Sequence, residues 1–168
     1  MVITKLEFGG KRKMIHIQEI PIENVDEFWK LHMQYLVDDK IISDEEDVEY
    51  FSGNEYRDTI VAHMKREQDK HHMVYFVRDN IAIGATQYNT YQSEDGKCFI
   101  LDFWVFPKYR GNGMGQECFY ALEKYTKADG ALYYELNSEK ENAIRFWKKL
   151  GFTENGTDEW GINLMIKK

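Results

Sequence analysis

The sequence predicts a mixed α/β domain in which one sheet carries helices on its faces. Strand-like and helix-like apolar patterns alternate along the chain, and the stretch from Phe99 to Leu136 has the order strand, helix, strand. Two strands joined in this way are expected to be parallel, with a right-handed crossover. A length of 168 residues suits a single domain, residues 1–168, and we find no internal repeat or linker.

The first predicted elements are a strand and an amphipathic helix. Residues Met14–Ile20 alternate between apolar and polar side chains, which is typical of a strand, and Pro21 closes it. Asn24 followed by Glu27 resembles a capping box, so we expect a helix to begin there. The side chains that fall on one inward face of this helix are Val25, Phe28, Trp29, His32 and Leu36.

Two further helical segments are predicted before the next strands. Ser43 and Glu46 repeat the cap signal, and the acidic residues around them suit the positive end of a helix dipole. Gly53 breaks this segment, and another helix continues to about Glu67. Its inward side chains are Tyr56, Ile60 and Met64.

Three strands are predicted next. Residues 71–79 and 81–91 are strand-like and meet at Asp79 and Asn80, which tolerate positive φ and so predict a tight hairpin. After a turn at 92–96, residues 97–106 form the most apolar strand of the chain. We therefore expect that strand at the centre of the sheet.

A helix from about Gly113 to Lys127 is predicted to follow, and Gly130 ends it. Its inward side chains are Met114, Cys118, Leu122 and Tyr125. Residues 131–137 then form another strand.

The last predicted elements are a helix and a hairpin. Ser138 with Glu141 caps the helix, and Gly151 stops it. The inward stripe of this helix consists of Ala143, Phe146, Trp147 and Leu150. Residues 151–156 and 159–168 make the hairpin.

Composition and charge limit the classes of function. The formal net charge is −7, which disfavours a nucleic-acid partner and suits a cationic ligand. Cys98 and Cys118 lack metal-type spacing, and two cysteines in a chain of this size indicate reduced thiols in a cytoplasmic protein. Lys11, Arg12 and Lys13 precede no apolar stretch of signal-peptide length, and no segment approaches the roughly 20 apolar residues of a membrane span. Neither a metal nor a membrane partner is expected.

The segment from Val105 to Glu117, VFPKYRGNGMGQE, joins the most apolar strand to a helix and contains three glycines. It is not a Walker loop, and its G-x-G-x-G spacing differs from the dinucleotide fingerprint. A plain turn would also use glycines. However, the first N–H groups of a helix lack partners and favour an anion, and glycines let a phosphate approach them. Arg110 adds a positive charge at the same edge, so the loop predicts a pyrophosphate site.

This segment resembles the acetyl-CoA signature of the GNAT superfamily of N-acetyltransferases, Arg/Gln-x-x-Gly-x-Gly/Ala. Arg110, Gly113 and Gly115 take its fixed positions. Residues Ala143–Phe152, AIRFWKKLGF, resemble the second family motif, a helix that ends in Leu-Gly-Phe. The element order and Gly84 in the third strand also agree, so the resemblance covers nearly the whole chain.

The resemblance implies a central mixed sheet of six or seven strands, with helices on both faces and a parallel strand pair that splays to admit the pantetheine arm of acetyl-CoA. It implies that the amides of Phe103 and Val105 bond the acetyl carbonyl and the pantetheine, and that Phe146 and Trp147 face the thioester. The amides implied for the pyrophosphate belong to Arg110, Gly111, Asn112, Gly113, Met114 and Gly115. Members are often dimers, which leaves a homodimer open.

Two residues depart from the family pattern. Many members have tyrosine where Trp147 stands, and that phenol can protonate the departing thiolate, whereas indole cannot act as an acid near neutral pH. Members also commonly have asparagine where Lys140 stands. A thiol with a pKa of roughly 8.5 leaves tolerably as thiolate, so activity is still expected. Tyr133 and Tyr134 are candidate proton donors, with strand packing as the alternative for both.

Asp102 is the candidate general base. The attacking amine must lose a proton, and Asp102 interrupts an apolar strand beside the expected acetyl group, where some family members have an acid. A buried acid needs a partner or a function, so a structural hydrogen bond is the alternative. No Cys or Ser nucleophile is indicated, and Cys118 is assigned to the core, so the attack is expected to be direct from a ternary complex.

The acceptor site of this fold is built from the first helices and nearby loops. An acidic cluster there could attract a cationic amine or could simply be a solvated face. Its members are Asp38, Asp39, Asp44, Glu45, Glu46, Asp47 and Glu49. Trp160 could wall the acceptor site or pack, and the adjacent His71 and His72 point to opposite sides of a strand and are assigned no metal.

These observations predict an N-acetyltransferase that moves an acetyl group from acetyl-CoA to a primary amine on a small molecule or peptide. The alternative is an acyl-CoA-binding or regulatory module of the same fold with weak catalysis, which Trp147 and Lys140 motivate. Another acyl donor or a hydroxyl acceptor is a further enzymatic alternative.

Overall fold

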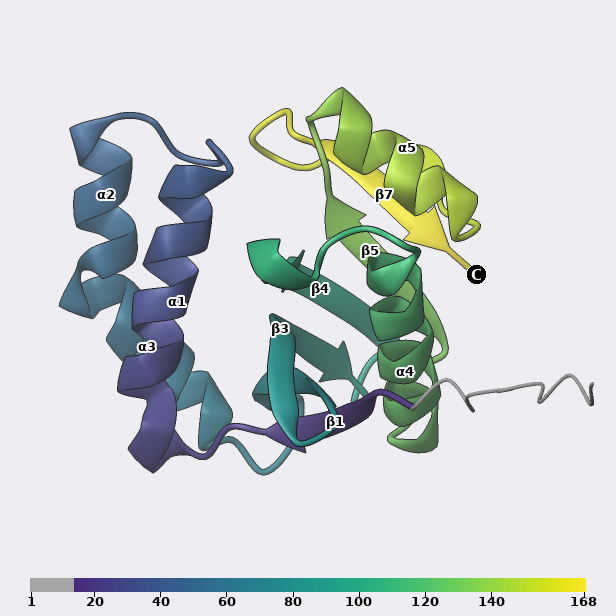
Figure 1. Cartoon of the computed structure of the whole chain (residues 1–168), viewed down its shortest axis with the longest axis horizontal. Coiled ribbons are helices and arrows are strands. Elements are labelled where there is room, and N and C mark those ends of the chain that lie inside the picture. The colour runs from purple at the N-terminus through teal and green to yellow at the C-terminus, as the bar shows by residue number, and fades with distance from the viewer. Residues whose placement is uncertain (1–13) are drawn as a thin grey trace, which may run out of the picture.

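The computed structural model describes residues 14–168, which form one mixed sheet of seven strands in the order β1-β2-β3-β4-β5-β7-β6 (Figure 1). Lys11, Arg12 and Lys13 lie outside the described residues. The strands are β1 (His16–Glu19), β2 (His71–Arg78), β3 (Ile81–Tyr91), β4 (Lys97–Val105), β5 (Tyr133–Asn137), β6 (Thr153–Thr157) and β7 (Asn163–Lys167). The predicted mixed sheet and the central place of β4 are confirmed.

Helices cover both faces of the sheet, as predicted (Figure 1). They are α1 (Val25–Asp38), α2 (Glu45–Ser52), α3 (Asn54–Met64), α4 (Met114–Ala128) and α5 (Glu141–Lys149), with short 3-10 turns at Ile22–Asn24 and Pro107–Tyr109. The first three helices lie on one side of the sheet, and α4 and α5 lie on the other. No helix among residues 14–168 is long and apolar enough to span a bilayer.

Strand pairing follows the predicted connections. The pair β4–β5 is parallel, and α4 makes the crossover between them. The neighbouring pairs β1–β2, β2–β3, β3–β4, β5–β7 and β6–β7 are antiparallel. Asp79 and Asn80 have φ values of 55° and 63°, which is the left-handed geometry expected of a tight two-residue hairpin.

The predicted helix caps are partly wrong. Asp44, and not Ser43, is the N-cap of α2, and its side chain accepts a hydrogen bond of 2.8 Å from the amide of Asp47. Asn24 makes no side-chain cap bond, because the preceding 3-10 turn leaves it at φ −112° and ψ 12° and outside the extended geometry of a capping residue. The N-cap of α5 is Lys140, not Ser138.

The core lies on both faces of the sheet. On the α4 and α5 side, fully buried side chains include Phe76, Phe119, Leu122, Tyr134, Leu136 and Met165. On the α1 and α3 side, the buried residues are Ile20, Phe28, Trp29, Ile60, Met73, Ala85 and Trp104. Tyr125, predicted to point inward on α4, is instead 37% exposed and donates a hydrogen bond to Glu19.

An irregularity in β4 decides which side chains face which layer. Asp102 pairs with Gln87 and Ile100 pairs with Tyr88, so Leu101 is an extra residue in the ladder, a β-bulge. Beyond the bulge, Phe103 packs with the α4 and α5 core, while Trp104 packs with the core beneath α1. The bulge therefore carries Asp102 to the α1 side of the sheet.

Candidate active site

The glycine loop leaves β4 and turns directly into α4. Gly111, Asn112 and Gly113 have φ values of 94°, 54° and 75°, so three consecutive residues are left-handed. Glycine adopts this conformation without strain, and asparagine does so more readily than most residues. A Cβ added at Gly111 or Gly113 would meet no atom within 4 Å, so open space lies in front of the loop.

Gly115 serves a different purpose in the same loop. A Cβ at this position would lie 2.9 Å from the ring of Phe146, so a larger side chain here would displace α5 packing. The amide of Met114 donates to the carbonyl of Gly111, and the amide of Glu117 donates to the carbonyl of Gly113. The amides of Gly115 and Gln116 belong to the first turn of α4, at the positive end of the helix dipole, which favours an anion.

Strands β4 and β5 part beside this loop. Their ladder runs from Lys97 and Tyr133 to Ile100 and Leu136, and β4 then continues to Val105 without this partner. The main chain of Phe103 and Val105 therefore lies where β4 has left β5. An extended amide-bearing chain, such as pantetheine, can pair with such an edge.

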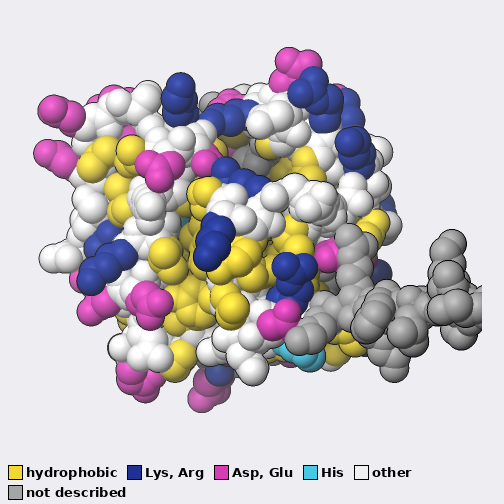
Figure 2. Space-filling model, in the orientation of Figure 1, with side chains coloured by type: hydrophobic (Ala, Val, Ile, Leu, Met, Phe, Trp, Pro, Cys, Tyr) yellow, Lys and Arg dark blue, Asp and Glu magenta, His cyan; other side chains and the backbone are white. Residues whose placement is uncertain are grey.

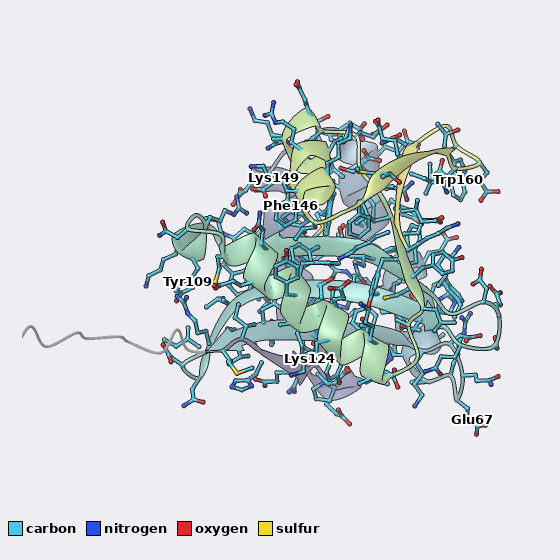
Figure 3. All side chains as sticks on the ribbon, turned by 90° about the vertical axis from the view of Figure 1, so that its right-hand side faces the viewer. Glu67, Tyr109, Lys124, Phe146, Lys149 and Trp160 are labelled. Atoms are coloured by element: carbon cyan, nitrogen blue, oxygen red, sulfur yellow. The ribbon has the colours of Figure 1, made fainter. Side chains whose placement is uncertain are left out.

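A cavity of about 730 Å³ connects the loop with this parted edge. Its walls include Phe103, Trp104 and Val105 from β4, and Phe146 and Ala143 from α5. Cationic side chains surround it, and they are Arg110, Lys140, Arg145 and Lys149. Figure 2 shows Lys and Arg side chains gathered between α1 and α5, and Figure 3 shows Phe146 and Lys149 on α5 at the same end of the sheet as Tyr109. In a chain with a net charge of −7, this basic rim favours an anionic ligand.

Arg110 reaches the end of α1. Its two terminal nitrogens donate to the two carboxylate oxygens of Asp39 at 3.1 and 2.9 Å, and its Nε donates to the carbonyl of Val105 at 2.7 Å. Lys140 donates to the main-chain carbonyl of Asp39. Asp39 is thus the carboxylate among the cavity-lining residues, and the loop charge that we predicted for a phosphate is shared with it.

The predicted thioester residues are placed differently from each other. Phe146 lines the cavity and lies 6.1 Å, between ring centroids, from Phe103. Trp147 is 7% exposed and packs edge-on against Phe103, Phe119 and Phe152, with centroid distances of 5.2, 5.7 and 5.1 Å. Phe146 therefore adjoins the cavity, while Trp147 supports it from the core.

Asp102 lies beneath α1 and makes hydrogen bonds there, as the alternative structural role given for it in the sequence analysis requires. His32 Nε2 is 3.0 Å from its Oδ2, and Gln87 Nε2 donates to the same oxygen at 2.5 Å. Burial acts to raise the pKa of Asp102, but the charge and hydrogen bond of His32 and the hydrogen bond of Gln87 leave it below its usual value. Asp102 is therefore ionised near neutral pH.

The tyrosines of β5 lie away from the cavity. Tyr134 is 1% exposed, its hydroxyl is 2.7 Å from Thr126 Oγ1, and it donates to the carbonyl of Glu123 beneath α4. Tyr133 donates to Asp95 at the opposite end of β5 from the parted edge. This placement does not support either residue as a proton donor to a thiolate. The reason is the side-chain alternation of β5, which turns Tyr134 into the core.

The structure places several of the other residues considered for the acceptor site. Of the acidic cluster, Asp39 lines the cavity, and Asp44 caps α2. Trp160 is 77% exposed and lies across the molecule from Tyr109 (Figure 3). His71 is buried whereas His72 stacks on Tyr88 nearer the surface, so the two do point to opposite sides of β2.

Tyr35 is a site residue that the sequence analysis missed. It lines the cavity from α1 and stacks on Trp104, with ring centroids 4.6 Å apart and planes 6° apart. Burial, with the nearby charges of Asp102 and Asp39, raises the pKa of its hydroxyl, so the group stays protonated. The signal available in the sequence was its helical spacing from Phe28 and His32, which places Tyr35 beside the inward face.

The chain was compared with protein-family models and with known proteins and structures. A family model described as the acetyltransferase (GNAT) family matches residues 26–152. The chain is similar to PaiA N-acetyltransferase from Thermoplasma acidophilum, solved in complex with coenzyme A, with 22% identity, a TM-score of 0.69, and 92% of this chain and 98% of that chain covered. It is also similar to an acetyltransferase from Thermus thermophilus, with 10% identity, a TM-score of 0.67, and 92% of this chain and 96% of that chain covered.

A third similar structure is Arabidopsis thaliana Naa50 in complex with the bisubstrate analogue CoA-Ac-MVNAL, with 16% identity, a TM-score of 0.60, and 92% of this chain and 98% of that chain covered. No match was found among curated proteins. The family match spans most of the chain, and the structural likeness shows the same fold. The chain therefore belongs to the GNAT acetyltransferase family.

Proposed function

We propose that this protein is an N-acetyltransferase that uses acetyl-CoA and acetylates a primary amine. The observation that carries the proposal is one cavity that joins the left-handed glycine loop to the parted edge of β4. The loop offers amides to a pyrophosphate, and the edge offers main-chain groups to an amide-bearing arm. A coenzyme with both parts matches this arrangement.

The residues present fit acetyl-CoA. The open space at Gly111 and Gly113 accommodates phosphate oxygens, and the cationic rim neutralises their charge. In this proposal the amides of residues 110–115 hold the pyrophosphate, and those of Phe103 and Val105 bond the arm. Phe146 packs at the cavity wall and Trp147 holds it in place. When bound, acetyl-CoA supplies the activated acetyl group.

Asp102 and Tyr35 carry the proton chemistry in this proposal. The ionised carboxylate of Asp102 attracts the ammonium group of the acceptor and takes up its proton directly or through water. The hydroxyl of Tyr35 stays protonated, so it can donate a hydrogen bond to the thiolate that leaves. Tyr35 thus takes the role that we had assigned to Tyr134. Amine attack is direct, within a ternary complex, and the structure of Naa50 with a bisubstrate analogue agrees with such a complex.

The acceptor is a cationic primary amine, on a small molecule or a peptide. The cavity is basic, so a positively charged acceptor needs a carboxylate; Asp39 lines the cavity, and Asp102 lies against His32 of α1, next in the chain to the cavity residues Phe103 and Trp104. Buried free thiols at Cys98 and Cys118 agree with a reducing compartment, and we propose a cytoplasmic location.

One observation favours a second candidate, an acyl-CoA-binding module with weak catalysis. Trp147 and Tyr134 are both packed in the core, so neither supplies an acid at the position where many family members use tyrosine. Under this alternative, the coenzyme binds in the same cavity but turnover is slow or absent.

Coenzyme binding and thiol release distinguish the two functions. Free acetyl-CoA at about 100 times its dissociation constant should stabilise either protein by roughly 2.7 kcal/mol. Only the enzyme should release free thiol when it is offered polyamines, aminoglycosides and peptides with a free N-terminus, with a rate that rises with pH. Binding without thiol release from any amine would favour the module, and no binding would contradict both.

A further inference from the structure

A row of buried polar side chains crosses the sheet beneath α1, and it ends at Asp102. Gln87 donates to Asp102 Oδ2, and its own Oε1 lies 2.8 Å from His71 Nε2. His71 Nδ1 in turn lies 2.8 Å from Asn89 Oδ1. His32, His71, Gln87 and Asn89 are all buried. Burial of polar groups is costly unless they are paired, and the members of this row are held by one another.

His32 is held rigidly against Asp102. Its ring stacks between Phe28 and Tyr56, at centroid distances of 5.7 and 6.3 Å and interplanar angles of 15° and 12°. The side chain of His32 is 0% exposed, and its Nε2 is 3.0 Å from Asp102 Oδ2. A carboxylate oxygen accepts, so Nε2 carries the hydrogen and donates.

The other nitrogen of His32 makes the pair unusual. Among residues 14–168, Nδ1 is a buried polar atom without a hydrogen-bond partner. A side chain retained for packing alone would be replaced by an apolar one without this loss. The polar contact that a histidine gains at this position is the one from Nε2 to Asp102.

Among residues 14–168, the hydrogen bonds to the carboxylate of Asp102 reach one of its two oxygens. Both His32 and Gln87 contact Oδ2, and the carboxylate side chain remains 14% exposed. Its neighbours Phe103 and Trp104 line the cavity, as does Tyr35. The carboxylate thus has one oxygen held by two contacts, and it adjoins residues of the cavity wall.

We propose that His32 and Gln87 are positioning residues that hold Asp102 as an oriented carboxylate and leave Oδ1 for the ammonium group of the acceptor. The inference rests on the proposed acetyl transfer and deepens it. The proton that the amine loses passes to Oδ1, while the N–H bonds from His32 and Gln87 stay on Oδ2. His32 acts through Asp102 and does not itself touch the substrate.

The charged and titratable groups around Asp102 agree with this role. His32 and Tyr35 face it from α1, Tyr56 from α3, and His71 from β2. Burial acts to raise the pKa of Asp102, and the interaction with His32 is the first of the effects that offset it. Loss of His32 should therefore move the protonation of Asp102 to higher pH.

The test is the pH profile of kcat/KM for His32→Gln, by thiol release with the best amine. We expect the acidic limb set by Asp102 to shift to higher pH by about one unit, so that activity on that limb falls by up to about 10-fold while activity above pH 7 changes little, with the coenzyme Kd within about 2-fold of wild type. In an Asp102→Asn background, His32→Gln should cost no further activity. His72→Gln is the matched control, because it removes another histidine–carboxylate contact, with Glu19 at 3.1 Å, away from the cavity.

Other outcomes would contradict either the positioning role of His32 or the proposed acetyl transfer. An unchanged pH profile in an active, folded His32→Gln enzyme, or an equal loss of activity in both backgrounds, would overturn the positioning role alone. A wild type that binds coenzyme and releases no thiol with any amine would contradict the proposed function. If His32→Gln does not fold, long-range ¹H–¹⁵N NMR of the wild type decides: a proton on Nε2 supports the role, and the Nδ1–H tautomer contradicts it.

Discussion

Arg110 and Asp39, which both line the cavity, form a two-pronged ion pair with N–O distances of 3.1 and 2.9 Å. Asp39 follows the last residue of α1, so the pair ties α1 to the glycine loop. The positive charge that a coenzyme phosphate would use is therefore already shared with a carboxylate. Coenzyme binding and the position of α1 should be linked through this contact.

Asp39→Asn should strengthen coenzyme binding. Removal of the carboxylate frees the charge of Arg110, and a partly exposed pair of this kind is worth about 0.2–1 kcal/mol, so the expected gain is up to about 5-fold in Kd. Calorimetric titration with CoA measures it. Glu154→Gln is the control, because it removes the same charge from an exposed pair with Lys148 outside the cavity. Weaker binding in Asp39→Asn would show that Asp39 instead holds Arg110 in place for the coenzyme.

Gly113→Val should abolish tight coenzyme binding and leave a folded protein. The residue has φ 75°, so a side chain costs roughly 1–2 kcal/mol in backbone strain, and the added atoms project into open space where the phosphates are proposed to lie. Gly156→Val is the matched control, because Gly156 has φ 69° and equally open space on β6. Both variants should lose similar stability in thermal denaturation, and only Gly113→Val should lose more than about 10-fold in affinity for CoA. Equal affinities would remove the loop from the site.

Tyr35→Phe should lower turnover without a change in coenzyme binding. Its hydroxyl is proposed to donate to the leaving thiolate, and loss of such a donor typically costs about 10- to 100-fold in kcat. The ring stack with Trp104 is kept, so the stability should change little. Tyr120→Phe, which alters an exposed hydroxyl on α4, serves as the control. Unchanged kcat in Tyr35→Phe would assign Tyr35 to packing.

The protein should be less stable in mild acid than at neutral pH, because His71 is buried as a neutral ring. Burial lowers its pKa to about 4, although hydrogen bonds with Asn89 and Gln87 oppose this effect. The unfolded chain binds the proton near pH 6.5, so the stability given by the neutral ring is complete above about pH 6.5 and is lost as the pH falls towards 4. Urea unfolding at pH 7 and 4.5 should show a loss of about 2–3 kcal/mol from this residue. His71→Gln should show a clearly smaller loss, and an equal loss in both proteins would contradict the assignment.

The sequence was sufficient for the fold because local signals and the global arrangement agree. The Asp79-Asn80 turn, the apolar run of β4 and the glycines that follow α4 and α5 all reflect short-range chemistry. The caps were less predictable: Ser43 and Asp44 are both good capping residues, and the path of the chain between helices decides which one is used.

The candidate site was predictable where backbone conformation defines it. The residues from Gly111 to Gly113 are left-handed, and glycine and asparagine are the residue types that adopt this conformation most readily. The bulge at Leu101 was not predictable, because a single extra residue leaves no composition signal and yet turns Asp102 to the other face of the sheet. The contacts of Asp102 with His32, and of Arg110 with Asp39, join residues 70 and 71 positions apart, which no local pattern encodes.

The most direct test of the account is a crystal structure of the protein with acetyl-CoA bound. We predict the pyrophosphate at the start of α4, with phosphate oxygens about 2.7–3.2 Å from amide nitrogens between Arg110 and Gln116, and the pantetheine arm beside Phe103 and Val105. A coenzyme bound elsewhere, with the loop empty and β4 unoccupied beyond its bulge, would contradict it.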